Sequence, residues 1–368
     1  MLITKLRLFH YRNIDEQEIT PCSGTSLFTG KNGQGKTNIL ESIYFLAYGR
    51  SFRTGTPRDC IQHGQKECLI EGTVEHGQLR RELKVSISNK EKTLFVFGKP
   101  AALDEFTGNL HLLAFTHEHM NVVRGGPADR RAFLDRAMVN LFPGHLRNLA
   151  MYGRAVKQRN RIMASIRDGT GHSNEKLMDS WDEALVKPGT RILCNRIDYV
   201  NRMKEQMPQG LFGDDNFRIH YLSTVTTTNN DVHGLEEVFR QRLRQTRDRD
   251  GHTGYTSVGP HRDDLRIYVN GKSLVDFGSA GQQRSCLLTL YFAQMEVHVK
   301  THGYYPVFLV DDAEAELDEI RLNTFLQYLS LRTQTILTSA RNFSLSSMSG
   351  SRCFFVVENG SVTASGRD

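Results

Sequence analysis

The chain has 368 residues, with 47 Lys and Arg against 41 Asp and Glu, so its formal net charge is +6. Hydrophobic residues make up 39% and charged residues 24%, which is typical of globular proteins and excludes a wholly disordered or fibrous chain. The length predicts roughly two or three structural units and leaves no room for a long coiled-coil arm beside an enzyme head. The mild positive charge permits a nucleic-acid partner without requiring one.

The sequence carries no membrane or export signal. Charges interrupt the apolar start at Leu2–Phe9, whereas a signal peptide has an unbroken apolar run. The longest apolar run, Ile43–Tyr48, is far shorter than the roughly 18 residues that indicate a transmembrane helix. The cysteines form no C-x-x-C pair, and scattered thiols fit a reducing compartment. We therefore expect a cytoplasmic protein with no membrane partner.

The first part of the chain predicts strands around one helix. Alternation predicts a strand over Leu2–Phe9, and a second strand over Ser26–Thr29 runs into a glycine-rich loop. Apolar residues at helical spacing over Ile39–Ala47 predict an amphipathic helix that ends at Gly49. Residues 66–97 carry strand-like segments that predict antiparallel β structure.

The middle of the chain predicts helices, over residues 127–167 and 174–207, with polar loops at 168–174 and 223–233. The last third returns to strands from Leu265 onward. A helix follows Gly281, later strands cover 307–310 and 335–337, and a hairpin over 353–362 turns at Asn359-Gly360. The pattern is a β-rich core with a mostly helical insertion.

A phosphate-binding loop is predicted between the second strand and the first helix. Residues 30–37, GKNGQGKT, fit G-x-x-x-x-G-K-[ST] in the strand–loop–helix context that the motif requires. Glycines let backbone amides turn toward anionic oxygens, so Lys36 is expected to reach the β- and γ-phosphates of ATP and Thr37 to ligate Mg²⁺. A chance glycine-rich turn is the alternative. The predicted nucleotide-binding residues here are Gly30, Lys31, Asn32, Gly33, Gln34, Gly35, Lys36, Thr37 and Asn38.

Two carboxylates follow a short apolar strand late in the chain. Residues 307–310 read VFLV, typical of a buried parallel strand, and Asp311 and Asp312 come directly after it. Asp311 is expected to hold Mg²⁺ and Asp312 to polarise the attacking water. Alone, the pattern also fits a strand that ends in a solvated acidic turn. Together with the phosphate loop it predicts an ATPase whose catalytic residues are Lys36, Asp311 and Asp312.

About 270 residues separate the phosphate loop from the acidic strand, so a large unit is inserted between two halves of one nucleotide-binding core. ABC-type ATPase heads have this layout, with a signature loop and helix before the acidic strand. Residues 277–284, FGSAGQQR, lie at that place, where Ser279, Gly281 and Gln282 could bind a γ-phosphate. Because the chain has its own phosphate loop, the pattern predicts a dimer with Ser279 facing the partner's ATP. An ordinary serine-capped helix start is the alternative.

Further motifs extend over nearly the whole chain. They are Tyr11-Arg12-Asn13, Tyr48–Arg53, Gly125–Asp135, Lys157–Asn160 and Gly259–Leu265. With them the chain resembles the RecF family, recombination mediators of the SMC/ABC-type ATPase superfamily. The resemblance implies an α/β fold: an ABC-type (SMC-like) P-loop ATPase head with an inserted, mostly helical second lobe and no long coiled coil. Lobe I, the ATPase core, would comprise residues 1–120 and 255–368, and lobe II residues 121–254.

The same resemblance implies how such a head works. Arg12, Asn13 and Asp318 of the D-loop would lie at the nucleotide, and ATP with Mg²⁺ would join two heads into a homodimer. The dimer would clamp double-stranded and gapped DNA near single-strand/double-strand junctions, and weak, DNA-stimulated hydrolysis would release it. It would act with RecO and RecR, and through them help to load RecA in gap repair and replication restart.

Some positions depart from the usual pattern of these ATPases. Asp312 stands where most transporter-type ABC ATPases have Glu, and the shorter side chain fits slow turnover. Ala315 replaces the usual Ser of the D-loop, residues 338–340 stand where a switch histidine is common, and His117 stands where the family usually has Pro. The sequence leaves open the roles of Thr116–Glu118, His261 and Arg262.

Basic residues gather on the first long helix of the insertion. Phosphates attract such groups without reading sequence, although a solvated helix face is the alternative. A second group, from Arg240 to Arg249, is diluted by acids, and the sequence leaves open whether it touches DNA. The DNA-binding candidates on the helix are Arg147, Arg154, Lys157 and Arg161.

Two arginines just past the phosphate-loop helix, Arg50 and Arg53, are expected to couple DNA contact to the ATP site. Pairing with the helix C-terminus is the competing interpretation.

Other functions compete with a DNA clamp. A transporter subunit would usually have a switch histidine and lack a long basic insertion, and a nucleotide kinase would need a substrate lid and no signature helix. A scaffold that binds ATP only to fix its shape is disfavoured by the intact Lys36, Asp311 and Asp312.

Overall fold

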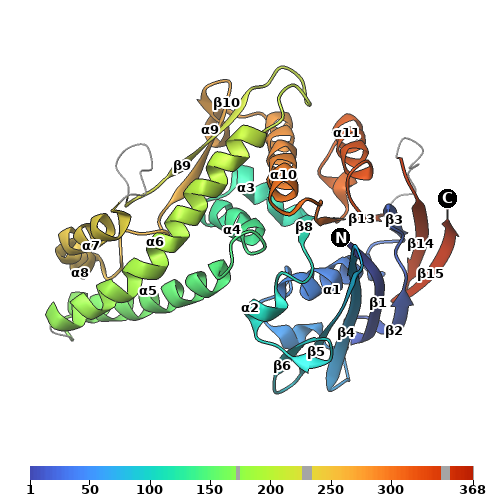
Figure 1. Ribbon diagram of the computed structural model, residues 1–368, viewed down its shortest axis with the longest axis horizontal. Coiled ribbons are helices and arrows are strands. Elements are labelled where there is room, and N and C mark those ends of the chain that lie inside the picture. Colours follow the sequence, from blue (N-terminus) through green and yellow to red (C-terminus); the bar gives the residue numbers. More distant parts are fainter. Residues whose placement is uncertain (171–174, 226–233, 341–348, 368) are drawn as a thin grey trace. The chain divides into compact units, whose positions relative to one another are not determined.

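The structure is a computed structural model that describes residues 1–170, 175–225, 234–340 and 349–367 (Figure 1). The chain divides into two compact units, residues 1–120 with 294–368, and residues 121–293. Residues 255–293, predicted to be part of lobe I, belong instead to the second unit, because β10 (Asp264–Val269) pairs along its whole length with β9 (Phe217–Leu222). The predicted loops at 168–174 and 223–233 lie partly outside the described residues.

The first unit contains a six-stranded sheet with the order β15-β14-β3-β13-β12-β8. Its neighbouring strands are parallel except for β14 and β15, which form the predicted terminal hairpin. Both β12 and β13 are buried over their whole length, as in parallel sheets covered on two faces. The carboxyl ends of β3, β13 and β12 therefore meet at one edge. The strands are β3 (Thr25–Thr29), β8 (Leu112–Phe115), β12 (Val307–Val310), β13 (Thr335–Ser339), β14 (Arg352–Glu358) and β15 (Ser361–Arg367).

A second, antiparallel sheet in this unit has the order β2-β1-β4-β5-β6-β7. This sheet confirms the antiparallel structure predicted over residues 66–97. The predicted first strand is β1, which pairs with β2 on one side and β4 on the other. The strands are β1 (Leu2–Tyr11), β2 (Ile14–Ile19), β4 (Glu67–His76), β5 (Leu79–Ser88), β6 (Lys92–Val96) and β7 (Lys99–Pro100).

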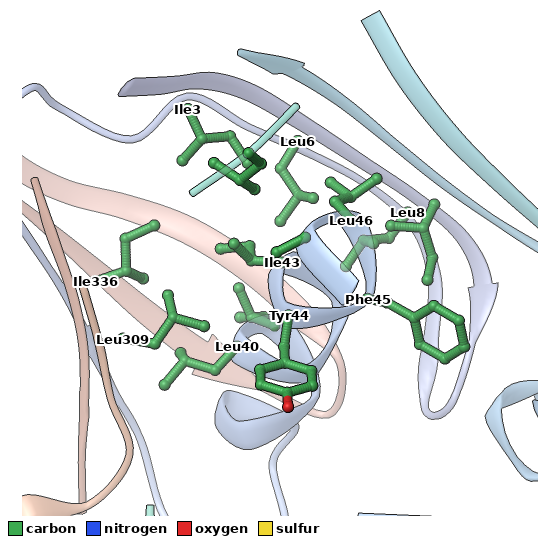
Figure 2. Close-up of a cluster of buried hydrophobic side chains, with 14 of the residues drawn as sticks. Ile3, Leu6, Leu8, Leu40, Ile43, Tyr44, Phe45, Leu46, Leu309 and Ile336 are labelled. Atoms are coloured by element: carbon green, nitrogen blue, oxygen red, sulfur yellow. The ribbon is translucent and has the colours of Figure 1, made fainter. Parts of the chain in front are cut away.

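Helix α1 (Lys36–Tyr48) lies between the two sheets. In Figure 2, Leu40 and Ile43 face Ile336 of the parallel sheet, whereas Leu46 lies toward Leu6 of the antiparallel sheet. Eleven of its thirteen residues are buried, so the one apolar face predicted from sequence understates its burial. Each buried Leu or Ile stabilises the unit by about 1.5–3 kcal/mol. The helix ends as predicted at Gly49, whose φ of 63° is the left-handed conformation that glycine tolerates.

Short elements and two helices complete the first unit. They are η1 (Pro57–Cys60), α2 (Leu103–Phe106), η2 (His117–Met120), η3 (Ala313–Ala315), α11 (Glu319–Ser330) and the C-terminal part of α10 (Ala280–His302).

The second unit is mostly helical, as predicted. The helical stretch predicted over 127–167 is two helices. The first ends at Met138 and the second begins at His145, just after Gly144, whose φ is 77°. A three-stranded sheet, β11-β10-β9, accompanies the helices. No helix in the described parts of the chain is long and apolar enough to cross a membrane. The other elements are α3 (Asn121–Arg124), α4 (Pro127–Met138), α5 (His145–Arg167), α6 (Glu175–Gln206), α7 (Leu235–Gln245), α8 (Arg247–Thr253), β11 (Lys272–Ser273) and α9 (Leu274–Phe277).

Candidate nucleotide site and basic surface

The phosphate loop connects β3 to the N-terminus of α1. Gly33 and Gly35 have φ angles of 82° and 114°, which L side chains rarely adopt. A Cβ on Gly35 would lie 2.7 Å from Asn13 Oδ1, so this position has neither the conformation nor the space for a side chain. The loop is therefore shaped by glycine to leave backbone amides at a helix N-terminus, where anions bind.

Lys36 lies across this loop. Its Nζ donates hydrogen bonds to the carbonyls of Gly30, at 2.8 Å, and Lys31, at 3.2 Å, although the residue is only 4% exposed. An ammonium has three donors, and these contacts hold it over the loop, where the motif places the β- and γ-phosphates.

The parallel sheet brings the acidic pair to the phosphate loop. Strand β12 delivers Asp311 to the edge at which α1 begins, and Thr37 Oγ1 donates to Asp311 Oδ1 at 3.0 Å. Thr338, at the end of β13, donates to the same oxygen at 2.7 Å. Burial raises the pKa of Asp311, and the two hydroxyl donors oppose that shift. A hydroxyl and a carboxylate are hard oxygen ligands that suit Mg²⁺ with ATP phosphates.

Asp312 takes a left-handed backbone conformation, with φ at 42°. Its amide donates to Thr338 Oγ1 at 3.0 Å, so one threonine hydroxyl bonds to both aspartates, through the Asp312 amide and the Asp311 carboxylate. Burial and the neighbouring Asp311 raise the pKa of Asp312. A carboxylate with a raised pKa is a better proton acceptor, which suits a residue that polarises water.

The turn of the terminal hairpin supports the loop from the other side. The amide of Gly360 donates to the Gln34 carbonyl at 2.9 Å, and the amide of Asn359 donates to Gln34 Oε1 at 2.6 Å. Asn13 Nδ2 donates to the same Gln34 carbonyl at 2.9 Å, and Asn13 Oδ1 accepts a hydrogen bond from Asn38 Nδ2 at 2.7 Å. Asn13, predicted at the nucleotide, thus holds the phosphate loop in shape.

Arg12 makes a two-pronged ion pair with the buried carboxylate of Glu41, at 2.9 and 2.6 Å. It also donates to the Asp59 carbonyl at 2.6 Å. Burial lowers the pKa of Arg12, but Glu41 outweighs this effect and raises it. Glu41 also accepts a hydrogen bond from Ser51. These bonds join β1, α1 and the segment after α1.

The segment after α1 carries both arginines predicted there. Arg50 and Arg53 are exposed and line a cavity of about 430 Å³ together with Lys92. Arg53 donates to Asn38 Oδ1 at 2.7 Å, and Asn38 reaches the phosphate loop through Asn13. Lys92, rather than Arg50, donates to the helix-terminal carbonyl of Gly49, at 2.7 Å. The cavity is therefore a basic surface with a hydrogen-bonded connection to the ATP loop.

The signature segment lies at the N-terminus of α10. Ser279 is exposed, its Oγ accepts from the Gln282 amide at 3.2 Å, and its own amide donates to Gln282 Oε1 at 3.0 Å. This reciprocal pair caps the helix, so the serine-cap alternative is also satisfied. Gln282 further donates to Asp215 at 2.9 Å, and Gly281 is partly exposed. Asp318, in the first unit, caps α11 by accepting from the Arg321 amide.

Helix α5 separates exposed cations from a buried one. In the described residues, none of the four exposed candidates on this helix pairs with a carboxylate. Arg159 is fully buried and pairs with Asp182 and Asp250 at 2.8 and 2.7 Å. The exposed candidates are Arg147, Arg154, Lys157 and Arg161.

The second basic group is partly neutralised. Arg240 pairs with Glu183 and Glu237, and Arg247 pairs with Asp182. These two arginines are therefore engaged within the second unit.

The residues whose roles the sequence left open have structural contacts within their own units. His261 Nδ1 lies 2.7 Å from Tyr152 Oη, and burial lowers the pKa of His261 to about 4. Arg262 donates to the Thr256 carbonyl at 3.1 Å. In the first unit, His117 contacts Glu316 at 2.5 Å, and Thr116 contacts His119.

Thr338, Glu41 and Gly360 belong to this site but were not predicted as site residues. An Asn-Gly turn indicates a hairpin and carries no information about what the turn packs against.

Comparison with known proteins gives a consistent result. A family model described as RecF/RecN/SMC N terminal domain matches residues 2–363. The chain is similar to the DNA replication and repair protein RecF of Streptococcus suis (strain 05ZYH33), with 33% identity over 370 residues, covering 99% of this chain and 100% of that one. A RecF of Citrifermentans bemidjiense is 34% identical over 371 residues, covering 97% and 99%.

Solved structures agree. The fold is similar to that of the recombination mediator protein RecF with ATP in the RecFOR pathway, with a TM-score of 0.88, 26% identity, and coverage of 99% of this chain and 97% of that one. An Smc head domain from Pyrococcus furiosus, with a TM-score of 0.56 and 14% identity over 99% and 95% of the two chains, shares the fold alone.

Proposed function

Because the chain belongs to the RecF family of SMC/ABC-type ATPase heads, we propose that it is a DNA replication and repair ATPase that closes on DNA as an ATP-bound dimer. The observation that carries the proposal is the bond between Thr37 and Asp311, because it joins the phosphate loop and the acidic strand at one place. ATP and Mg²⁺ are the cofactors.

The residues divide the chemistry among themselves. Lys36 binds the transferred phosphoryl group, Thr37 and Asp311 hold Mg²⁺, and Asp312 orients and polarises water. Asp312 has a shorter side chain than the usual Glu, so hydrolysis is weak. DNA binding stimulates it.

Dimerisation is supported by two exposed apolar side chains, one beside the signature segment and one beside the D-loop. Phe277, two residues before Ser279, is 70% exposed, and Ile320, two residues after Asp318, is 79% exposed. Such apolar side chains gain stability when a partner covers them. In the dimer, Ser279, Gly281 and Gln282 of one copy meet the γ-phosphate held by the other. Sedimentation tests this: ATP should convert monomer to dimer, and Ser279→Arg should stay monomeric. A wild type that stays monomeric with ATP refutes it.

DNA binding is assigned to the exposed cations of α5, which contact phosphates without reading sequence. Arg50 and Arg53 contact DNA at the same surface, and Arg53 relays that contact to the phosphate loop through Asn38. The preferred targets are duplexes at single-strand junctions and gaps. The decisive experiment is duplex binding with and without ATP across a salt series. ATP should tighten binding, and Lys36→Ala should abolish the effect. DNA binding that ignores both ATP and Lys36→Ala excludes the clamp.

The family relationship also supports the cellular role, in the cytoplasm, with RecR and RecO as partners and RecA loading as the outcome. A gapped DNA substrate tests this. With RecO and RecR, the protein should increase RecA assembly on the gap, and Lys36→Ala should not.

A further inference from the structure

Three imidazoles meet in the first unit at a place that the nucleotide chemistry does not use. His111 directly precedes β8, and His298 and His302 lie one turn apart on the last part of α10. Their ligand nitrogens all lie within 4.8 Å of one another. His111 and His298 are buried and His302 is partly exposed, so the cluster has one side open to solvent.

Backbone contacts set the direction of the central ring. His298 Nδ1 lies 2.9 Å from the Tyr304 carbonyl, which only accepts hydrogen bonds, so Nδ1 carries the proton. In neutral His298 the Nε2 lone pair then points at His111 Nδ1, 2.8 Å away. An outer N–H held by a backbone carbonyl, with the lone pair of the inner nitrogen directed into the cluster, is the usual arrangement of a metal-ligating histidine.

We propose that His111, His298 and His302 bind one divalent transition-metal ion of the Zn²⁺ type. Imidazoles at i and i+4 of a helix share one face, and three such nitrogens favour Zn²⁺, Ni²⁺ or Cu²⁺ over Mg²⁺. Zn–N bonds of about 2.0–2.1 Å place tetrahedral nitrogens about 3.3 Å apart, so His111 Nδ1 and His298 Nε2, which are 2.8 Å apart, separate slightly on binding. The Tyr304 hydroxyl, 2.9 Å from His111 Nδ1, or water takes the fourth position.

The ion would fasten the start of β8 to the end of α10. Tyr304 leads into β12, which pairs with β8 and ends just before Asp311, so the site lies at the opposite end of these strands from the nucleotide chemistry. Its role is structural, and we expect binding to be independent of ATP and unchanged in Lys36→Ala.

Co²⁺ is the probe, because its visible absorption reports coordination. The tag-free full-length chain, stripped by a chelator, should bind one Co²⁺ with an intense, tetrahedral-type spectrum that Zn²⁺ displaces. His302→Gln should weaken Co²⁺ binding at least about tenfold. His220→Gln, which changes an exposed histidine on β9, should bind like the wild type. Equal affinity of wild type and His302→Gln, or no Co²⁺ binding by the wild type, overturns the proposal.

A second measurement tests the proposal on the wild type alone, in case His302→Gln does not fold. In the wild type, Zn²⁺ should raise the thermal midpoint by several degrees in a concentration-dependent way, and a chelator should reverse the rise. A midpoint that ignores Zn²⁺ overturns the proposal even if His302→Gln does not fold.

Discussion

The contact between the hairpin turn and the phosphate loop makes a sharp prediction for Gly360→Ala. Gly360 has a φ of 81°, and an added Cβ would lie 2.0 Å from the Asn13 carbonyl oxygen. Ordinary van der Waals contacts begin at 3.4 Å, so the turn must move away from the loop. That movement breaks the bonds from Gly360 and Asn359 to Gln34.

The magnitude follows from those two hydrogen bonds. Each contributes about 1 kcal/mol net, so the loop shape that binds phosphate becomes less favourable by about 1–2 kcal/mol. ATP affinity should therefore fall by about 5- to 30-fold. The positive φ alone costs Ala about 1–2 kcal/mol of folding stability, and this contribution must be separated.

Gly98→Ala is the matched control. Gly98 lies in the same unit with a φ of 73°, and nothing lies within 4 Å of its added Cβ. It should lose similar conformational stability and keep wild-type ATP affinity. Fluorescent-nucleotide titration measures the affinity, and urea unfolding measures the stability. If Gly360→Ala binds ATP as the wild type does, or both variants lose affinity equally, the hairpin does not support the loop.

Three other variants test the remaining contacts. Arg159→Ala leaves two buried carboxylates short of a partner and should lower the free energy of urea unfolding by about 3 kcal/mol. Arg154→Ala should change stability by less than about 0.5 kcal/mol and should lower the salt dependence of DNA binding. Equal stabilities of the two variants refute the assignment of Arg159 to the core. Asp311→Asn should abolish Mg²⁺-dependent ATP binding yet raise the thermal midpoint at pH 7, because the raised pKa of Asp311 means that its ionisation opposes folding. Thermal scans from pH 7 downward should show this gain in midpoint fading as the wild-type carboxyl becomes protonated. A gain that persists below a pH of about 3.8 contradicts this reasoning. Thr338→Val removes the hydroxyl shared by Asp311 and Asp312 and should lower kcat about tenfold or more with less effect on KM; an unchanged steady-state kcat contradicts the shared support.

The sequence predicts the strand–loop–helix at Gly30–Thr37 and the acidic strand well, because each is a local pattern with a fixed geometry. It predicts their meeting only through the general rule that the carboxyl ends of parallel strands share an edge. It does not predict the support that Gly360 gives to Gln34, because that contact joins residues more than 300 positions apart without a chemical signature.

Helix α5 shows how far helical periodicity reaches. Arg159 lies on the buried stripe with Tyr152 and Met163, at the same helical spacing, whereas the predicted DNA-binding candidates such as Arg154 lie on an exposed face. Strand β9 likewise alternates buried Phe217, Ile219 and Tyr221 with exposed residues. The boundary predicted near residue 255 lies instead after residue 293, because the pairing of β9 with β10 was not predicted and it keeps β10 in the second unit.

The burial of α1 has a consequence for motion. A helix packed against a sheet on either side cannot tilt without opening one of two cores, so it behaves as a fixed post behind the phosphate loop. Any conformational change on nucleotide binding must then occur in segments around the loop that can move without exposing a buried core. The partly exposed stretch from Arg50 to Gly55, which Arg53 connects to the loop through Asn38, is the segment best placed to respond to nucleotide.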